Sequence, residues 1–329
     1  MAIGVGGQGY LGVNVEVTPG TYLAPVTTVP ILNETLMYAE ARYLSPSIRK
    51  STMFSDVKQS YYHVEGDVEV EVDTQTFIYL MHATRSAVVK TGVGPYTYVF
   101  TPSTGASAGP NGNTATPKTL SITIVRNSQV FKYVGCVVSS YNVRVENGIL
   151  LATFSIIGLG EVSINSDTPA AAILPTSSLL GANAHTVSLA TPVASPTVPT
   201  WVAATNFQTF QFSVNDNGNA EVRIQPNRQA AFVSFGQTEG KISATRDFEV
   251  RADYDNFVAS TLGAFQLKSV NAASDSVQFN AYRGVYTAFP ISLPSIGGIV
   301  VANAEVEMMS FGPLRSLDVT VVTPTVNIV

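Results

Sequence analysis

The chain offers few side chains suited to acid–base, nucleophilic or metal chemistry. No two of its three histidines, His63, His82 and His185, share the spacing of a metal-ligand motif. Cys136 is the only cysteine, and no partner motif of a zinc or redox site accompanies it. Carboxylate pairs are frequent, but alternating strands with a solvated face produce such pairs routinely. We therefore predict no catalytic residue, no metal site and no cofactor.

A glycine pattern near the start matches a dinucleotide-binding motif only in its spacing. Gly4, Gly6 and Gly9 fit G-x-G-x-x-G, yet no strand pattern precedes them and no helix pattern follows. The same segment lacks the basic and apolar regions of a signal peptide. We interpret it as an N-terminal arm of a protein that is not an enzyme.

The composition indicates either a fold that is well packed on its own or, as we favour, a protein that buries much of its surface against neighbours. Charged residues make up 12% of the 329 residues, where about 25% is usual. The net charge is −5 and no basic stripe is present, which argues against a nucleic-acid grip made through counter-ion release. The lone cysteine fits a reducing cytoplasm. The longest apolar run, residues 148–160, is too short to span a bilayer.

The elements that position these side chains are mainly strands. Apolar and polar residues alternate over residues 67–73, 120–124 and 141–146, as expected for strands with one buried face. Asn147-Gly148 between two such runs predicts a hairpin, because both residues tolerate positive φ. Helical spacing occurs at Thr74–Thr84, with Asp73 or Thr74 as its cap, and at Asn256–Phe265. A shorter candidate at Ala170–Leu180 is interrupted by Pro175. The pattern predicts an all-β fold with minor α.

The first of these strands presents an acidic face. Val68, Val70 and Val72 form its apolar side. The opposite side carries four carboxylates, Asp67, Glu69, Glu71 and Asp73. The corresponding stretch of the second half mixes both signs of charge, in Glu249, Arg251, Asp253 and Asp255.

Two similar halves flank a segment of different composition. Residues 161–206 are rich in Pro, Ala, Ser and Thr and nearly free of charge, as in a linker or functional loop. Residues 101–117 form a second such stretch, interpreted as an exposed loop. Glu69-Val70, Asp73 and Phe77 recur at the same spacings in the second half, as Glu249-Val250, Asp253 and Phe257. We predict a duplication, with β domains at 1–160 and 207–329.

Longer stretches of the chain resemble the tail tube proteins of long-tailed phages. The resemblance is carried by GYLGVNVEVTPGTY (9–22), KTLSITIVRNSQVFKYVGCVVSSYNVRVENGILLATFSIIGLG (118–160), FQFSVNDN (210–217), EGKISATRDFEVRADYDNF (239–257) and VYTAFPISLPSIGGIVVANAEVEMM (285–309). It implies a β-barrel or sandwich flanked by a helix, repeated here in tandem. It also implies a virion protein whose copies join edge to edge in rings that stack into a hollow tube. Members that carry the domain twice would form trimers with pseudo-sixfold symmetry.

The resemblance also implies partners and surfaces. The partners are further copies of the chain and other tail proteins (tape measure, terminator, distal tail), with DNA passing through without specific binding. Residues 41–59 resemble the long loop that reaches adjacent subunits, and this segment holds four basic residues, Arg42, Arg49, Lys50 and Lys58. They fit either contact with an acidic neighbour or an ordinary solvated loop. The acidic face at Asp67–Asp73 fits either a tube lumen or a solvated outer face.

Other functions stay open at this point. The chain also fits another virion β-protein, such as a tail terminator or a fibre. A carbohydrate-binding β-sandwich module is the alternative from a different class. Such modules present clustered exposed aromatic residues, whereas Trp201 is the only tryptophan and lies in the predicted linker.

Overall fold

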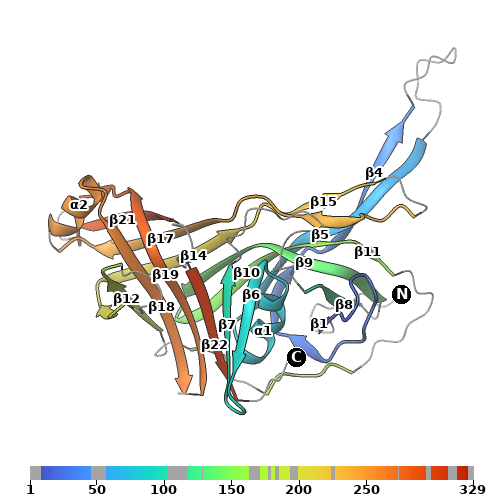
Figure 1. Cartoon of the computed structure of the whole chain (residues 1–329), viewed down its shortest axis with the longest axis horizontal. Helices are drawn as coiled ribbons and strands as arrows, with labels where there is room; N and C mark the ends of the chain where they lie inside the picture. Colours follow the sequence, from blue (N-terminus) through green and yellow to red (C-terminus); the bar gives the residue numbers. More distant parts are fainter. Residues whose placement is uncertain are drawn as a thin grey trace.

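The computed structural model describes residues 9–45, 57–102, 118–127, 129–162, 171–176, 179–181, 185–192, 199–223, 227–249, 251–272, 274–293, 298–309 and 317–324. These residues form strands and two helices, so the predicted all-β fold with minor α is confirmed (Figure 1). Twenty strands belong to one hydrogen-bonded sheet, and β15 and β16 form a separate pair.

The elements follow one another in this order: β1 (Tyr10–Val15), β2 (Thr27–Val29), β3 (Ile31–Glu34), β4 (Met37–Leu44), β5 (Val57–Glu71), α1 (Thr74–His82), β6 (Ser86–Thr91), β7 (Tyr96–Pro102), β8 (Leu120–Arg126), β9 (Gln129–Glu146), β10 (Ile149–Gly158), β11 (Gly160–Glu161), β12 (His185–Ala190), β13 (Val202–Ala204), β14 (Phe207–Asn215), β15 (Asn219–Glu221), β16 (Phe232–Ser234), β17 (Glu239–Asp247), α2 (Arg251–Val258), β18 (Leu262–Ala272), β19 (Asp275–Ala288), β20 (Ile291–Ser292), β21 (Val301–Met308) and β22 (Leu317–Thr323).

One scheme of antiparallel pairing occurs twice along the chain. In the first half the strands are ordered β2, β1, β8, β9, β10, β5, with β3 and β4 along the outer side of β5. In the second half they are ordered β13, β12, β18, β19, β21, β17, β14. In each half a helix follows the strand that lies next to the outermost one. Helix α1 follows β5, and α2 follows β17.

The two halves are joined through the sheet itself. β14, the outermost strand of the second half, pairs with the C-terminal part of β9 in the first half. The hairpin β6–β7 of the first half pairs with β22 at the end of the chain. Figure 1 shows the sheet running from α2 at the left, through β17 and β14, to β5 and the projecting β4 at the right.

Helix α1 packs within the main core. The Asp73 carboxylate caps its start by accepting hydrogen bonds from the backbone N–H groups of Gln75 and Thr76 at 2.8 and 2.9 Å. The Phe77 ring lies 5.7 Å from Phe154 of β10 and 6.0 Å from Phe279 of β19. Residues of both halves therefore form the core against which α1 packs. The predicted helix and its cap are confirmed.

The predicted hairpin is also confirmed. β9 and β10 are joined by Asn147 and Gly148, with φ values of 50° and 73°. Val68, Val70 and Val72 are buried, as the alternation predicted. In β8 the polar residues Ser121 and Thr123 are buried as well, because they bond Glu16 and Tyr22 of the N-terminal segment.

One expectation about local structure was wrong. The second helix covers Arg251–Val258 rather than Asn256–Phe265, and residues from Leu262 onward form β18, which is held between β12 and β19. The segment predicted as a linker, residues 161–206, contains β12 and β13. The predicted loop at 101–117 lies mostly outside the described residues, which end there at Pro102 and resume at Lys118.

Candidate functional site

Six adjacent strands, β5, β10, β9, β14, β17 and β21, present one continuous polar face. Successive side chains of a strand point to opposite sides of a sheet, so each strand contributes alternate residues to it. The side chains on the other side are apolar and buried, and they include Val68, Phe154, Val143, Phe212, Ile242 and Val306. Because that side is covered by the core, the polar face is the one left to solvent or to other molecules.

Register aligns the polar residues in rows across the strands. One row runs through Glu69, Thr153, Asn142, Ser213, Lys241 and Glu307. The next runs through Asp67, Ser155, Ser140, Asn215 and Glu239. The central strands β10, β9 and β14 thus contribute mainly hydroxyl and amide groups, and most carboxylates lie on β5, β17 and β21.

The polar face holds the excess of negative over positive charge in the chain. Its nine carboxylates and two basic side chains give a formal charge of −7, whereas the whole chain carries −5. The carboxylates are Glu65, Asp67, Glu69, Glu71, Glu146, Glu239, Asp247, Glu305 and Glu307, and the basic residues are Arg144 and Lys241. The remainder of the chain is therefore slightly positive.

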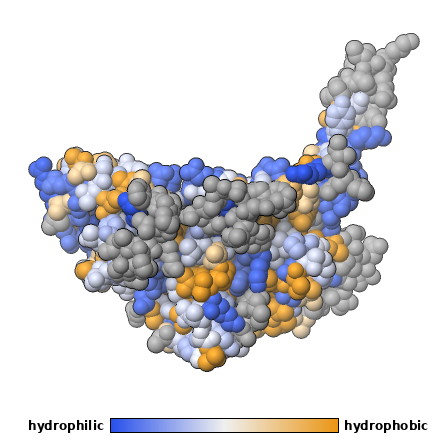
Figure 2. Space-filling view, viewed as in Figure 1, coloured by the Kyte–Doolittle hydropathy of each residue, from blue (hydrophilic) through white to orange (hydrophobic). Residues whose placement is uncertain are grey.

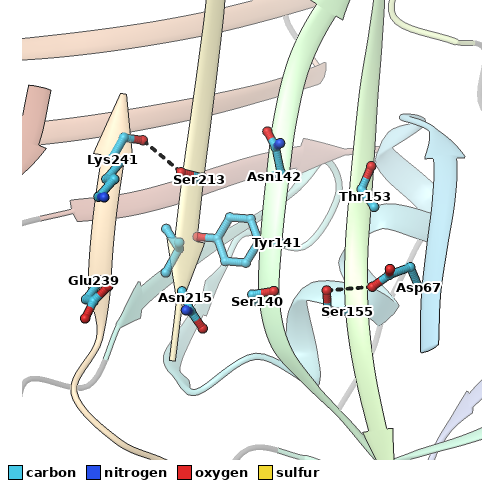
Figure 3. Close-up of a pocket in the computed structure, with 11 residues that line it drawn as sticks. Asp67, Ser140, Tyr141, Asn142, Thr153, Ser155, Ser213, Asn215, Glu239 and Lys241 are labelled. Atoms are coloured by element: carbon cyan, nitrogen blue, oxygen red, sulfur yellow. Dashed lines mark hydrogen bonds between the residues drawn. The ribbon is translucent and has the colours of Figure 1, made fainter. Parts of the chain in front are cut away.

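The centre of the face is hollowed. A pocket of about 420 Å³ lies over five strands and is lined by hydroxyl, amide and charged groups (Figure 3). Asp67 and Ser155 lie at one end, joined by a 2.7 Å hydrogen bond from the Ser155 hydroxyl. Glu239 and Lys241 lie at the other end. Figure 2 shows hydrophilic surface at the base of the arm formed by β4 and β5, and hydrophilic and hydrophobic residues mixed over the α2 end.

Arg144 partly neutralises the face. Its Nη2 lies 2.5 Å from Oε1 of Glu69, and its Nε lies 3.0 Å from Oε2 of Glu146. The hydrogen bond to Glu69 is the main reason that the pKa of Arg144 is raised. The remaining carboxylates outnumber the basic groups, so the face stays acidic near neutral pH.

The structure separates the four predicted acidic residues. Asp67, Glu69 and Glu71 lie on the polar face, at outward positions of β5. Asp73 does not share this face, because it lies beyond the end of β5, is 1% exposed and caps α1. The stretch from Glu249 to Asp255 does not correspond to this face either, because it follows β17 and enters α2.

The predicted basic residues belong to the arm. Arg42 lies on β4, 3.8 Å from the Glu40 carboxylate, and Lys58 lies exposed at the start of β5. Arg49 and Lys50 lie outside the described residues. The second half touches the base of the arm, where Arg228 contacts Glu40 at 2.7 Å and its backbone oxygen accepts a hydrogen bond from the Tyr62 N–H.

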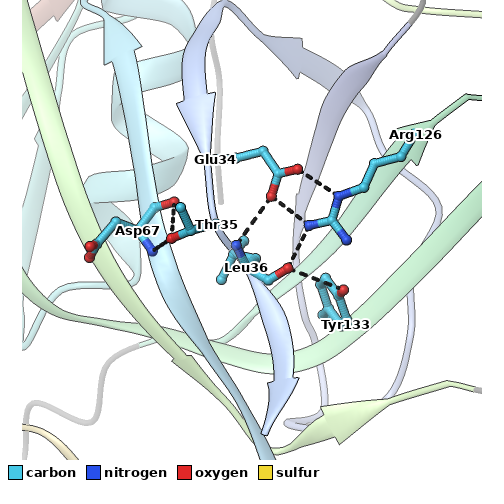
Figure 4. Close-up of polar contacts among 6 residues, drawn as sticks. All are labelled: Glu34, Thr35, Leu36, Asp67, Arg126 and Tyr133. Atoms are coloured by element: carbon cyan, nitrogen blue, oxygen red, sulfur yellow. Dashed lines mark hydrogen bonds and ion pairs between the residues drawn. The ribbon is translucent and has the colours of Figure 1, made fainter. Parts of the chain in front are cut away.

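An ion pair that sequence reasoning missed fixes the start of the arm. Nε and Nη2 of Arg126 in β8 donate to the two carboxylate oxygens of Glu34, each at 2.6 Å (Figure 4). Nη2 also donates to the backbone oxygen of Leu36 at 2.5 Å. Such a two-pronged contact is directional and stronger than a single surface pair. It holds the passage from β3 to β4 against β8, although the partners are far apart in sequence.

The side chains considered first for chemistry occupy structural positions. Cys136 is buried, and burial raises the pKa of its thiol. His185 lies 2.8 Å from the Ser269 hydroxyl, and His63 lies 3.0 Å from Glu65. The described ranges contain no cluster of His, Cys, Asp and Glu suited to a metal. No helix among them is long and apolar enough to cross a membrane.

Both ends of the sheet leave strand edges without a partner strand in the described residues. At one end β3 and β4 pair only with β5. At the other, the part of β19 beyond Val285 and the short β20 pair only with β21. Open edges of this kind are sites where another chain can add a strand.

The fold defines an all-β protein with a broad polar face. The family model described as phage tail tube protein matches residues 6–310. The chain therefore belongs to the phage tail tube protein family, whose members are structural components of the virion tail. Comparison with curated proteins gave no match.

Proposed function

We propose that this chain assembles with copies of itself into rings that stack into the hollow tail tube, and that DNA passes through the bore. Membership of the tail tube family supports this role. The observation that supports the passage of DNA is the acidic polar face, which spans strands from both halves and holds a formal charge of −7. We assign this face to the wall of the bore.

An acidic wall suits passage of a polyanion. A basic wall would release counter-ions from DNA and bind its phosphates, which would slow transit. Like charge keeps the phosphates at a distance, and the effect grows in a narrow space where salt screens less completely. The hydroxyl and amide groups at the centre of the face keep the wall wetted without adding positive charge.

The proposed ring contains three chains with six similar repeats. The pairing scheme that occurs twice supports a duplication, with β12 and β13 in the second half as the counterparts of β1 and β2 in the first. In this proposal the domain of residues 1–160 and that of residues 207–329 take the positions of two subunits of a six-membered ring. The second domain gains β12 and β13 from the segment 161–206.

The arm of β4 and β5 is proposed to contact a neighbouring subunit or the next ring. It projects from the body in Figure 1 and carries Arg42 and Lys58, with Arg49 and Lys50 between them in the sequence. Positive charge on an otherwise acidic protein favours contact with an acidic surface of another copy. The remaining proposed partners are the tape measure, terminator and distal tail proteins. We further propose that the chain is made in the host cytoplasm and has no enzymatic activity, cofactor or membrane partner.

Electron microscopy of the purified chain tests the assembly. Negatively stained samples are expected to show stacked rings or hollow tubes, and Arg42→Glu with Lys58→Glu should shorten them if the arm works as proposed. A persistent monomer that binds glycans would instead identify a carbohydrate-binding module. Single rings that never stack would indicate a tail terminator.

The wall assignment is tested by reversing charge. Assembled Asp67→Lys/Glu239→Lys protein should retain duplex DNA in a salt-dependent manner, because its bore would bind phosphate. The matched control is Glu221→Lys/Glu249→Lys, which makes the same change in net charge outside the polar face. Equal DNA retention by the two variants would place the polar face elsewhere than on the bore.

A further inference from the structure

The contact between the two halves of the chain is a strand joint with a defined register. Ser140–Arg144 of β9 pair with Gln211–Asn215 of β14, with Ser140 opposite Asn215. This pairing begins where β8 stops, because β8 covers β9 only up to Cys136 on that edge. The joint therefore fills the edge that β8 leaves free.

The second half has the same edge, and in the described residues it is empty. β18 covers β19 from Asp275 to Val285 and stops there. Beyond that point Ala288 and β20 continue beside β21, but no described strand lies on their other edge. This edge, residues 286–292, takes the place in the second half that Ser140–Arg144 take in the first.

The two helices differ in how far they are buried, and a joint at only one of them explains the difference. Helix α1 packs against strands of both halves, where Phe77 reaches Phe279 of β19, and most of its residues are buried. Helix α2 has no buried residue, and Val258 at its end is 63% exposed. Further exposed apolar side chains lie in the segments around β20, namely Ile291, Leu293 and Ile299. An apolar surface next to an open strand edge lacks the cover that the second half provides for α1.

The opposite end of the molecule carries the complementary strand. β14 lies on the outer side of β17, and β3 with β4 lies on the outer side of β5, so these segments hold equivalent places in the repeated scheme. The outer edge of β14 is filled by β9, whereas that of β3 and β4 has no partner strand in the described ranges. The α2 end and the arm end lie at opposite ends of the long axis in Figure 1.

We propose that the edge of residues 286–292 binds the segment from β3 to β4 of a second copy of this chain, and that the body of that copy covers α2. This inference rests on the proposed self-assembly and specifies its joint. The register of the internal joint can be transferred to this contact by treating the last residues of β5 and β17 as equivalent. Ala39 then takes the place of Asn215, and Ala288 takes the place of Ser140. Ala288 of one copy therefore lies opposite Ala39 of the next. Because the two surfaces differ, the contact is head to tail and closes a ring when its rotation allows.

Cysteine cross-linking tests the register. Ala39→Cys/Ala288→Cys protein is expected to form covalent dimers and trimers on mild oxidation, resolved by non-reducing gel electrophoresis. Ser140→Cys/Asn215→Cys serves as the internal equivalent and should form a bond within one chain. Ala39→Cys/Ala272→Cys is the mismatched control and should remain mostly uncross-linked. Native Cys136 is buried and is not expected to interfere.

The role of α2 has its own variant. Val258→Lys should abolish or sharply reduce ring formation while leaving the thermal stability of the monomer unchanged, because the side chain is exposed there. Val93→Lys, at a site 96% exposed in the turn between β6 and β7, is the control that should still assemble.

The outcomes separate this joint from the proposed function. Rings that form without the Ala39–Ala288 cross-link, while the internal control oxidises, would overturn the joint and leave tube assembly standing. Absence of rings in the unmodified protein under all assembly conditions would overturn the proposed function itself. Equal assembly of the Val258→Lys and Val93→Lys proteins would remove α2 from the contact.

Discussion

Acidification should destabilise the folded chain through His82. The ring is buried at the end of α1, with edge-on contacts to Tyr98 and Phe100 at 5.9 and 5.3 Å. Neither ring nitrogen has a hydrogen-bond partner among the residues that the structure describes. Burial, with a smaller contribution from Lys118, lowers the pKa of His82 from 6.5 to about 4. The imidazole is therefore neutral in the folded protein over most of the pH range.

The sign and size of the effect follow from linkage. Between pH 6.5 and 4 the unfolded chain binds a proton at His82 that the folded chain does not, so acidification favours unfolding. The contribution of neutral His82 to the free energy of unfolding is fully present above pH 6.5 and is lost as the pH falls towards 4. At about 1.4 kcal/mol per pKa unit, the full loss is about 3.5 kcal/mol, and most of it, about 2.5 kcal/mol, is reached by pH 4.5.

Urea unfolding at pH 7 and pH 4.5 measures this loss. The comparison is between the natural chain and His82→Phe, which keeps an aromatic ring among its neighbours and cannot be protonated. Other groups titrate in both proteins, so the difference between their pH dependences isolates His82. A drop in unfolding free energy that is the same in both proteins would refute the reasoning.

Four further variants address the fold. Phe77→Ala should lower the unfolding free energy by about 3–5 kcal/mol, because the ring is buried between both halves; a loss below about 1 kcal/mol in chemical denaturation would contradict the shared core. Asp73→Ala should cost about 1 kcal/mol through the lost helix cap, and an unchanged midpoint would count against it. Glu16→Gln should cost about 1.5–3 kcal/mol, since this carboxylate accepts hydrogen bonds from Ser121 and the Gly135 N–H, both at 2.9 Å; calorimetry checks this against Glu16→Asp. Gly135→Ala should lower the melting temperature, because its φ is +63° and a Cβ there would lie 2.5 Å from Leu159.

Local features of this fold were predictable from neighbouring residues. The hairpin at Asn147-Gly148 is specified by two residues that accept positive φ, and the buried side of β5 is specified by three alternating valines. The cap of α1 is likewise a local contact of Asp73. These elements depend on interactions within a few positions, so their sequence signals are complete.

The polar face was only partly predictable because its rows join distant strands. Asp67, Glu69 and Glu71 were found from alternation within one strand. The carboxylates of β17 and β21 were missed, because the short match to the first half pointed to Glu249–Asp255 instead. Those residues lie beyond the end of β17 at Asp247. The short sequence match therefore aligned the end of β5 with the start of α2 instead of with β17.

Long-range pairing also overrode local preference at two other places. Helical spacing extended to Phe265, but β12 and β19 on either side draw residues from Leu262 onward into the sheet. β12 and β13 lie in a stretch whose Pro, Ser and Thr content is typical of a linker. They are ordered by pairing, because β12 pairs with β18 and β13 pairs with β12. The composition of this stretch does not predict either pairing.

A cryo-electron microscopy reconstruction of the assembled chain tests the central claim most directly. The account predicts a hollow tube of three chains per ring, with Asp67, Glu69 and Glu239 facing the bore. A tube in which these carboxylates line the outer surface, or a protein that forms no tube at all, would contradict it.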